Sequence, residues 1–141
     1  MKKNKLFACL VAGTILPMPV AADIDVGVTA LETGDFKAAI SAFEQDLSME
    51  ATAFEAHWRT GQALVSMGNS KKALKYLETA TEMQPDHVDA LYWWGAANGE
   101  VAGEASVFSA PGYAKACRKA FERVLELDPA HIEARAGLVE N

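Results

Sequence analysis

Residues 54–87 read FEAHWRTGQALVSMGNSKKALKYLETATEMQPDH, and this stretch decides the fold. Four of its residues have the i, i+3, i+4, i+7 spacing of one face of an α-helix: His57, Thr60, Gly61 and Leu64. Gly68 then predicts the end of this helix, because glycine readily adopts the left-handed conformation that follows a helix C-terminus.

A second helix is predicted after Gly68. Ala73, Leu77 and Ala80 form another single stripe, and Pro85 ends the segment, because a helix rarely continues into proline. Gly61 on the first helix is small enough to let the second helix approach closely. We therefore expect Leu77 to be a buried contact between the two helices.

The same pattern occurs earlier in the chain. Residues 34–39, GDFKAA, resemble residues 68–73, GNSKKA, at an offset of 34 residues, and Phe43 and Leu77 keep this offset. Self-similarity at a fixed period of this length is the signature of a helical repeat protein.

A helix–turn–helix unit of 34 residues resembles the tetratricopeptide repeat (TPR). Three positions depart from the TPR pattern, because His57 stands where tryptophan is usual, Thr60 where leucine is usual, and Leu77 where an aromatic residue is usual. The resemblance implies an all-α fold, a right-handed superhelix of about three TPR units and a terminal helix. Four positions fit the pattern: Gly61, Ala73, Ala80 and Pro85.

The resemblance covers residues 23–141. Pro129 follows Pro85 by 44 residues, so the third unit contains a ten-residue insertion. The helices of the first unit are expected at residues 23–33 and 35–49. The units, followed by a capping or truncated helix, are expected at residues 23–53, 54–87, 88–131 and 132–141.

The insertion falls within residues 99–112. We expect its first part to extend the preceding helix, and Ala110-Pro111-Gly112 to form a turn. Val107 and Phe108 then either pack onto the core or belong to a flap at the edge of a ligand groove.

Residues 1–22 have the order of features found in secretory signal peptides. Three lysines precede an apolar run of 11 residues, Leu6–Leu16, and Val20-Ala21-Ala22 offers small residues to a signal peptidase. This run is shorter than the roughly 20 residues that span a bilayer. We expect cleavage before Asp23, a location in the periplasm or outside the cell, and no integral membrane segment after cleavage.

Cleavage would leave 10 basic and 19 acidic residues, a net charge of −9. Such a surface repels the phosphates of nucleic acids and anionic membranes, so neither is an expected partner. Cys117 would be the one remaining cysteine, which excludes a disulfide within the mature chain.

The sequence offers no motif for catalysis or for metal binding. His57, His87 and His131 lack the CxxC, HxxxH and HExxH spacings of metal sites. Cys117 lies where the repeat takes a small buried residue, and no activating base is near it in sequence. We therefore expect no enzymatic activity, no metal site and no cofactor.

In TPR arrays the first helices line a concave groove that holds a protein or peptide segment, and the resemblance implies such a groove here. Trp58 and Tyr92, 34 residues apart, would either anchor a ligand or fill the space between first helices. Only Arg59 suits a terminal carboxylate, which argues against a clamp for a chain end. Eight residues form the expected groove, which we call the first-helix stripe: Glu55, Trp58, Arg59, Gln62, Asp89, Tyr92, Trp93 and Ala96.

The leading hypothesis is a periplasmic adaptor that holds a protein segment during envelope assembly, secretion or cofactor-protein maturation. The segments Tyr92–Gly95 and Ser106–Gly112 also resemble a group of exported bacterial TPR proteins. Two alternatives remain: a structural module that self-associates through its last repeat, and a fragment of a larger enzyme.

Overall fold

The computed structural model describes residues 22–140, so the expected signal segment lies outside the described residues except for Ala22. These residues form helices and turns and contain no strand. The elements are α1 (Ala22–Glu32), α2 (Phe36–Glu44), the short 3-10 helix η1 (Asp46–Ser48), α3 (Ala53–Ser66), α4 (Ser70–Met83), α5 (Val88–Glu104), α6 (Ala110–Leu127) and α7 (Ile132–Glu140).

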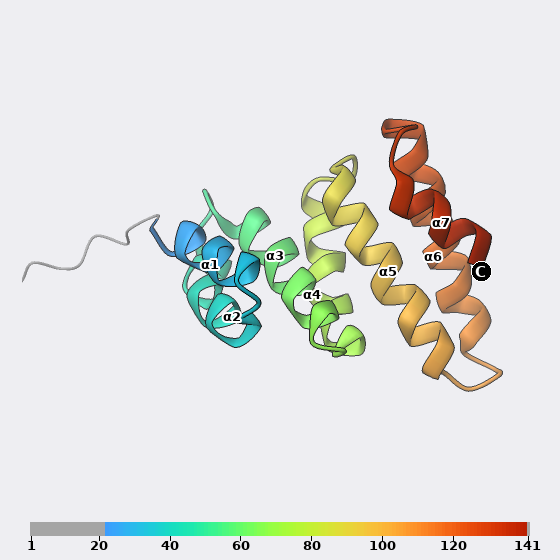
Figure 1. The fold of residues 1–141 in the computed structure, drawn as a ribbon, viewed down its shortest axis with the longest axis horizontal. Helices are drawn as coiled ribbons and strands as arrows, with labels where there is room; N and C mark the ends of the chain where they lie inside the picture. The colour runs from blue at the N-terminus through green and yellow to red at the C-terminus, as the bar shows by residue number, and fades with distance from the viewer. Residues whose placement is uncertain (1–21, 141) are drawn as a thin grey trace, which may run out of the picture.

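The helices follow one another along an elongated array (Figure 1). Helices α1 and α2, α3 and α4, and α5 and α6 pack as three helix–turn–helix units, and α7 packs on α6. The expected all-α repeat fold is confirmed. No helix in the described part of the chain is long and apolar enough to cross a membrane.

Within each unit, a glycine on the first helix lies against a large side chain on the second. A Cβ atom at Gly61 would lie 2.3 Å from Cγ of Leu77, which is closer than carbon atoms can approach. Leu77 is fully buried, so its predicted role as the contact between the two helices is confirmed. The three pairs are Gly27 with Phe43, Gly61 with Leu77, and Gly95 with Phe121.

Gly68 ends α3 as predicted. Its φ angle is +75°, a conformation that costs glycine little, and its N–H donates to the carbonyl of Val65 at 2.8 Å. The N–H of Asn69 donates to the carbonyl of Leu64 at 2.8 Å, which completes a Schellman motif. Gly34 repeats this arrangement after α1 with a φ angle of +79°.

The second helix of the first unit is shorter than expected. Helix α2 ends at Glu44 rather than near Met49, and η1 follows it. The side chain of Asp46 is 1% exposed and accepts a hydrogen bond from the hydroxyl of Thr52 at 3.0 Å. This inward-facing carboxylate holds a turn where the expectation was a continuous helix.

The insertion lengthens both helices of the third unit. Helix α5 extends to Glu104 as expected, but the turn expected at Ala110-Pro111-Gly112 is wrong, because α6 begins at Ala110. Proline fits the first turn of a helix, where its missing N–H breaks no helical hydrogen bond. Val107 and Phe108 are 81% and 94% exposed, so their packing onto the core is also wrong.

Candidate functional site

The structure places the first-helix stripe on α3 and α5, but its members differ in exposure. Asp89 is exposed, whereas Trp58 is only 7% exposed, so of its two expected roles the structure favours filling the space between helices over anchoring a ligand. The partly exposed members are Glu55, Arg59, Gln62, Tyr92, Trp93 and Ala96.

Trp58 belongs to the core at the junction of the second and third units. It clusters with buried residues of α3, α4 and α5, and its ring centroid lies 5.6 Å from that of His87. The guanidinium of Arg59 lies 4.0 Å from the centroid of a Trp58 ring, and Arg59 Nε donates to Glu55 Oε1 at 3.3 Å. The one cation of the stripe is therefore held between an aromatic ring and a carboxylate.

Tyr92 is packed on one side and partly exposed. Its ring stacks on Phe121 at 5.8 Å, lies 4.9 Å from His131, and meets the Trp93 ring edge-to-face at 5.4 Å. Burial, followed by the nearby charge of Glu133, raises the pKa of Tyr92. Its hydroxyl therefore stays protonated at neutral pH and can donate a hydrogen bond.

His87 and His131 have a role that the sequence interpretation missed. The Nδ1 atom of His87 accepts a hydrogen bond from the N–H of Ala90, and Nδ1 of His131 accepts one from the N–H of Ala134, both at 3.3 Å. Each histidine thus caps a first helix and contacts the aromatic stripe residue of the preceding unit. The sequence signal for this capping role was that each histidine stands at the equivalent repeat position, one residue before a helix.

His57 packs within its own unit. Its Nδ1 lies 2.6 Å from the carbonyl oxygen of Ala53, and its ring centroid lies 6.2 Å from that of Tyr76. The described residues contain no group of three or more His, Cys, Asp or Glu side chains placed to hold a metal ion.

Cys117 is 1% exposed in the third unit. Burial raises the pKa of its thiol, and the positive charge of Arg118 opposes part of this rise. A protonated, buried thiol is a poor nucleophile, so the surroundings of Cys117 favour packing over chemistry.

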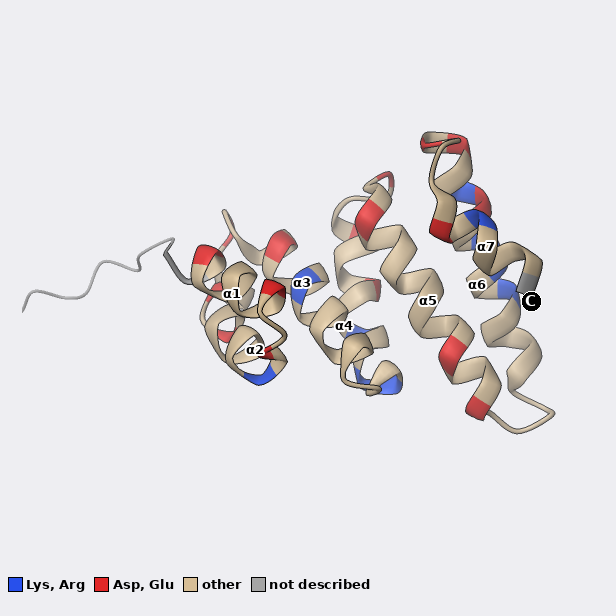
Figure 2. Cartoon of the chain, viewed as in Figure 1, with Lys and Arg blue, Asp and Glu red and all other residues tan. Residues whose placement is uncertain are grey.

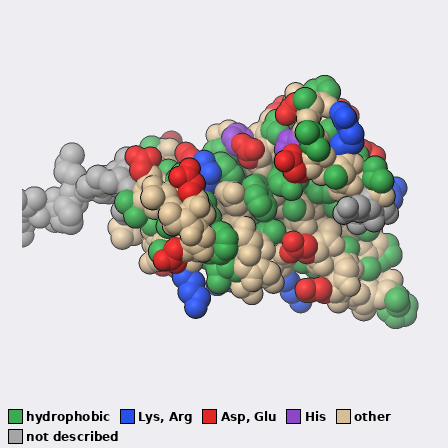
Figure 3. All heavy atoms as spheres, in the orientation of Figure 1, with side chains coloured by type: hydrophobic (Ala, Val, Ile, Leu, Met, Phe, Trp, Pro, Cys, Tyr) green, Lys and Arg blue, Asp and Glu red, His purple; other side chains and the backbone are tan. Residues whose placement is uncertain are grey.

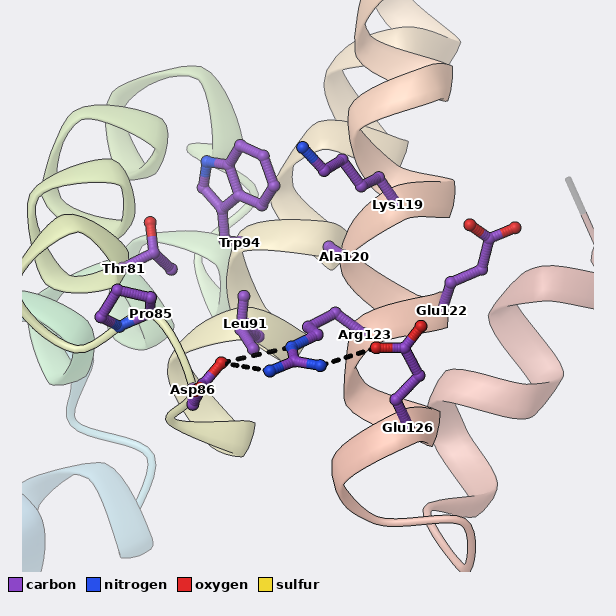
Figure 4. A pocket seen from close by; sticks show the side chains of 10 residues that line it. All are labelled: Thr81, Pro85, Asp86, Leu91, Trp94, Lys119, Ala120, Glu122, Arg123 and Glu126. Atoms are coloured by element: carbon purple, nitrogen blue, oxygen red, sulfur yellow. Dashed lines mark hydrogen bonds and ion pairs between the residues drawn. The ribbon is translucent and has the colours of Figure 1, made fainter.

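A hollow of about 450 Å³ lies between α4, α5 and α6, and no member of the first-helix stripe lines it (Figure 4). Nη2 of Arg123 donates to Asp86 at 2.6 Å and Nη1 donates to Glu126 at 2.7 Å, which joins α6 to the turn before α5. The Lys119 side chain extends toward the Trp94 side of the hollow. The lining residues are Thr81, Pro85, Asp86, Leu91, Trp94, Lys119, Ala120, Glu122, Arg123 and Glu126.

The face seen in Figure 3 carries hydrophobic side chains across its middle, acidic side chains scattered over it, and histidine side chains toward its upper edge. The site thus offers two surfaces of different chemistry. The stripe on α3 and α5 presents aromatic rings with acidic residues beside them, whereas the hollow between α4 and α6 combines an aromatic ring with both charge signs.

Comparison with solved structures identifies the fold. The chain is similar to the TPR protein TTC0263 of Thermus thermophilus, with a TM-score of 0.72 and 17% identity over 83% of this chain and 61% of that chain. It is similar to the first TPR of Spaghetti (RPAP3), solved with an HSP90 peptide, with a TM-score of 0.71 and 19% identity over 84% and 86%. For MamA of Desulfovibrio magneticus RS-1 the TM-score is 0.65, with 23% identity over 82% and 60%.

The chain spans about three fifths of the length of the TTC0263 and MamA chains. No curated protein is significantly similar to it. Residues 30–96 match the sequence profile of the tetratricopeptide repeat. This match, the glycine contacts repeated in three units and the shared fold together show that the chain contains tetratricopeptide repeats and has the fold of that repeat.

Proposed function

We propose that this chain is a periplasmic scaffold that holds a segment of another protein against the first-helix stripe. It would act as an adaptor in envelope assembly, secretion or maturation of a cofactor protein. The TPR fold is a protein-interaction scaffold, and the first TPR of RPAP3 holds an HSP90 peptide. The signal-like features of residues 1–22 support the periplasmic location.

The observation that carries this proposal is the partly exposed Tyr92–Trp93 pair on α5. Tyrosine and tryptophan are enriched among residues that dominate binding energy, because they offer large contact areas. The burial of Trp58 moves the expected anchor from Trp58 and Tyr92 to Tyr92 and Trp93. Asp89 is exposed one turn before them and would act as a rim charge.

Affinity capture from a periplasmic extract, with the mature chain as bait, tests the proposal. Trp93→Ala should weaken the binding of a captured partner by about 2 kcal/mol or more. Trp94→Ala is the matched control, because Trp94 is also partly buried on α5 but faces the hollow between α4 and α6. Equal binding by wild type and Trp93→Ala would count against the stripe as the binding surface.

Self-association is a second candidate, favoured by the outer side of α7. Ile132 and Val139 are 74% and 83% exposed on this helix, and exposed apolar side chains are typical of contact surfaces. If α7 packs on a second copy, the apparent mass in sizing experiments should rise with concentration, and Val139→Glu should abolish the rise. A constant monomer mass would contradict this candidate.

A further inference from the structure

Basic residues of this acidic chain gather on the second helices of the units. Eight of the ten lysines and arginines after residue 22 lie on α2, α4 and α6. Figure 2 shows these helices carrying most of the blue residues. Six exposed residues on α4 and α6 form what we call the basic strip: Lys71, Lys72, Lys75, Lys115, Arg118 and Lys119.

The strip follows the repeat register. Lys71 and Lys115 are 44 residues apart, as are Lys75 and Lys119, which is one repeat plus the ten-residue insertion. Equivalent positions on α4 and α6 therefore both carry a positive charge. Lys71 and Tyr113 line one hollow between these helices.

Lys119 lines a second hollow together with Thr81 of α4. Lys71 and Lys119 of the strip thus border two hollows between α4 and α6, which together we call the groove. Carboxylates line it as well: Glu104 in the first hollow, and Asp86, Glu122 and Glu126 in the second. Val101 and Trp94 of α5 lie in the two hollows, so α5 forms the floor.

The helix dipole does not account for the positions of Lys71 and Lys72. Lys71 and Lys72 lie in the first turn of α4, at the positive end of the helix dipole, whereas Glu82 lies near its negative end. This order is the reverse of the one that stabilises a helix. No ion pair found among the described residues uses a member of the basic strip, so its charges face solvent.

Apolar residues line one hollow of this groove and lie next in sequence to two residues that line the other. Ser106 and Ser109, which flank the exposed pair Val107 and Phe108, line the hollow beside Lys71. At the other end, Trp94 and Leu91 contribute apolar surface to the hollow of about 450 Å³, which is large enough for an apolar side chain (Figure 4).

We propose that the groove between α4 and α6 binds an acidic polypeptide segment, with one apolar side chain of that segment seated against Trp94. Its carboxylates would pair with the basic strip, and charge complementarity would set its position along the groove. The choice of a polypeptide ligand rests on the proposed scaffold function. The surface is separate from the first-helix stripe, since the two share no residue.

Fluorescence anisotropy with a labelled, glutamate-rich peptide that carries a central tryptophan tests the proposal. The purified protein should bind this peptide, and replacing every glutamate of the peptide by glutamine should weaken binding about tenfold or more. Lys119→Glu should weaken binding about tenfold. Lys37→Glu on α2 is the matched control, because Lys37 is an exposed second-helix lysine outside the strip, and its effect should stay below about twofold.

The tryptophan variants separate this groove from the first-helix stripe. Trp94→Ala should weaken peptide binding about tenfold, whereas Trp93→Ala should leave it unchanged. Circular dichroism checks that both variants remain folded. Failure of the peptide to bind would overturn the groove proposal, whereas loss of a captured partner through Trp93→Ala would still support the stripe.

Two further results would also overturn the proposal. If Lys37→Glu weakened peptide binding as much as Lys119→Glu, the attraction would reflect general charge rather than this groove. If vesicles containing anionic lipid bound in place of the peptide, the basic strip would belong to a membrane-binding surface.

Discussion

At the residue scale, Trp58 and Tyr92 show how one repeat position performs two tasks. Both rings contact a histidine that caps the first helix of the next unit, at 5.6 Å for Trp58 with His87 and 4.9 Å for Tyr92 with His131. Trp58 is buried by this packing, whereas Tyr92 keeps part of its surface exposed. Trp58 therefore joins units together, and Tyr92 can also contact a ligand.

Trp58→Ala should destabilise the protein by roughly 3–5 kcal/mol, the usual cost of removing a large buried ring. Urea denaturation measures this change in the free energy of unfolding. Tyr92→Ala is the comparison at the equivalent position, and it should cost less because Tyr92 is partly exposed. If Trp58→Ala lowered the free energy of unfolding by less than about 1 kcal/mol, Trp58 would be a surface residue, and its ring would again be a candidate ligand anchor.

The thiol of Cys117 should react slowly with a thiol reagent in the folded protein and rapidly in urea. Burial raises its pKa, so the reactive thiolate is scarce near pH 8 as well as inaccessible. In the unfolded chain the thiol has a pKa of about 8.5, so it ionises at a lower pH there than in the folded protein. The stability that the buried thiol contributes therefore falls as the pH rises above that value. Equal rates in the folded and unfolded states would contradict the burial.

The sequence predicted the contact residues within a unit better than the exposure of the stripe. Helical spacing places Gly61 and Leu77 on facing sides of one hairpin, and their contact follows from that spacing alone. The burial of Trp58 depends on His87 from the next unit and on the angle between units. Periodicity within one helix carries no information about that angle.

At the scale of the elements, close approach of paired helices defines each unit. The glycines of α1, α3 and α5 each face a large side chain on the partner helix.

The turn residues of the sequence predicted the boundaries of the helices less well than the glycines predicted their contacts. Ala110-Pro111-Gly112 suits a turn or the first turn of a helix, and α6 adopts the second alternative. No sequence signal indicated that Asp46 would turn inward and shorten α2.

Gly61→Ala should destabilise the second unit, because the new methyl group would overlap Leu77, 2.3 Å away, and force the helices apart. Overpacking of this kind costs about 1–3 kcal/mol. Removing the other partner by Leu77→Ala should cost roughly 2–5 kcal/mol through the cavity that it leaves.

Gly103→Ala is the control for helix propensity. Gly103 lies in α5 with no atom within 4 Å of a Cβ at that position, so alanine should be neutral or stabilise by up to about 1 kcal/mol. Thermal unfolding compares the three variants. Equal stability changes for Gly61→Ala and Gly103→Ala would show that the contact with Leu77 does not limit the helix spacing.

At the scale of the whole molecule, each helix contacts mainly its neighbours along the chain. Leaving the short η1 aside, the main contacts join helices that are consecutive or next but one in the chain. Each surface therefore combines residues from neighbouring units, as the first-helix stripe does on α3 and α5 and the basic strip does on α4 and α6. In such an array, stability is close to a sum of unit and interface contributions.

Hydrogen exchange should reveal this arrangement as a gradient of protection along the chain. Helices α4 and α5 each pack between neighbours on both sides, whereas α7 packs mainly on α6, and only Ala134 among its described side chains is buried. Amides of α7 should exchange through local opening at a small free-energy cost, and those of α4 and α5 should approach the free energy of global unfolding, about 5–15 kcal/mol.

Leu77→Ala should lower protection in α3, α4 and α5 more than in α7, because α7 shares no contact with Leu77 and opens without the central units. Uniform protection from α1 to α7, with uniform loss in Leu77→Ala, would instead show that the array unfolds as one cooperative unit.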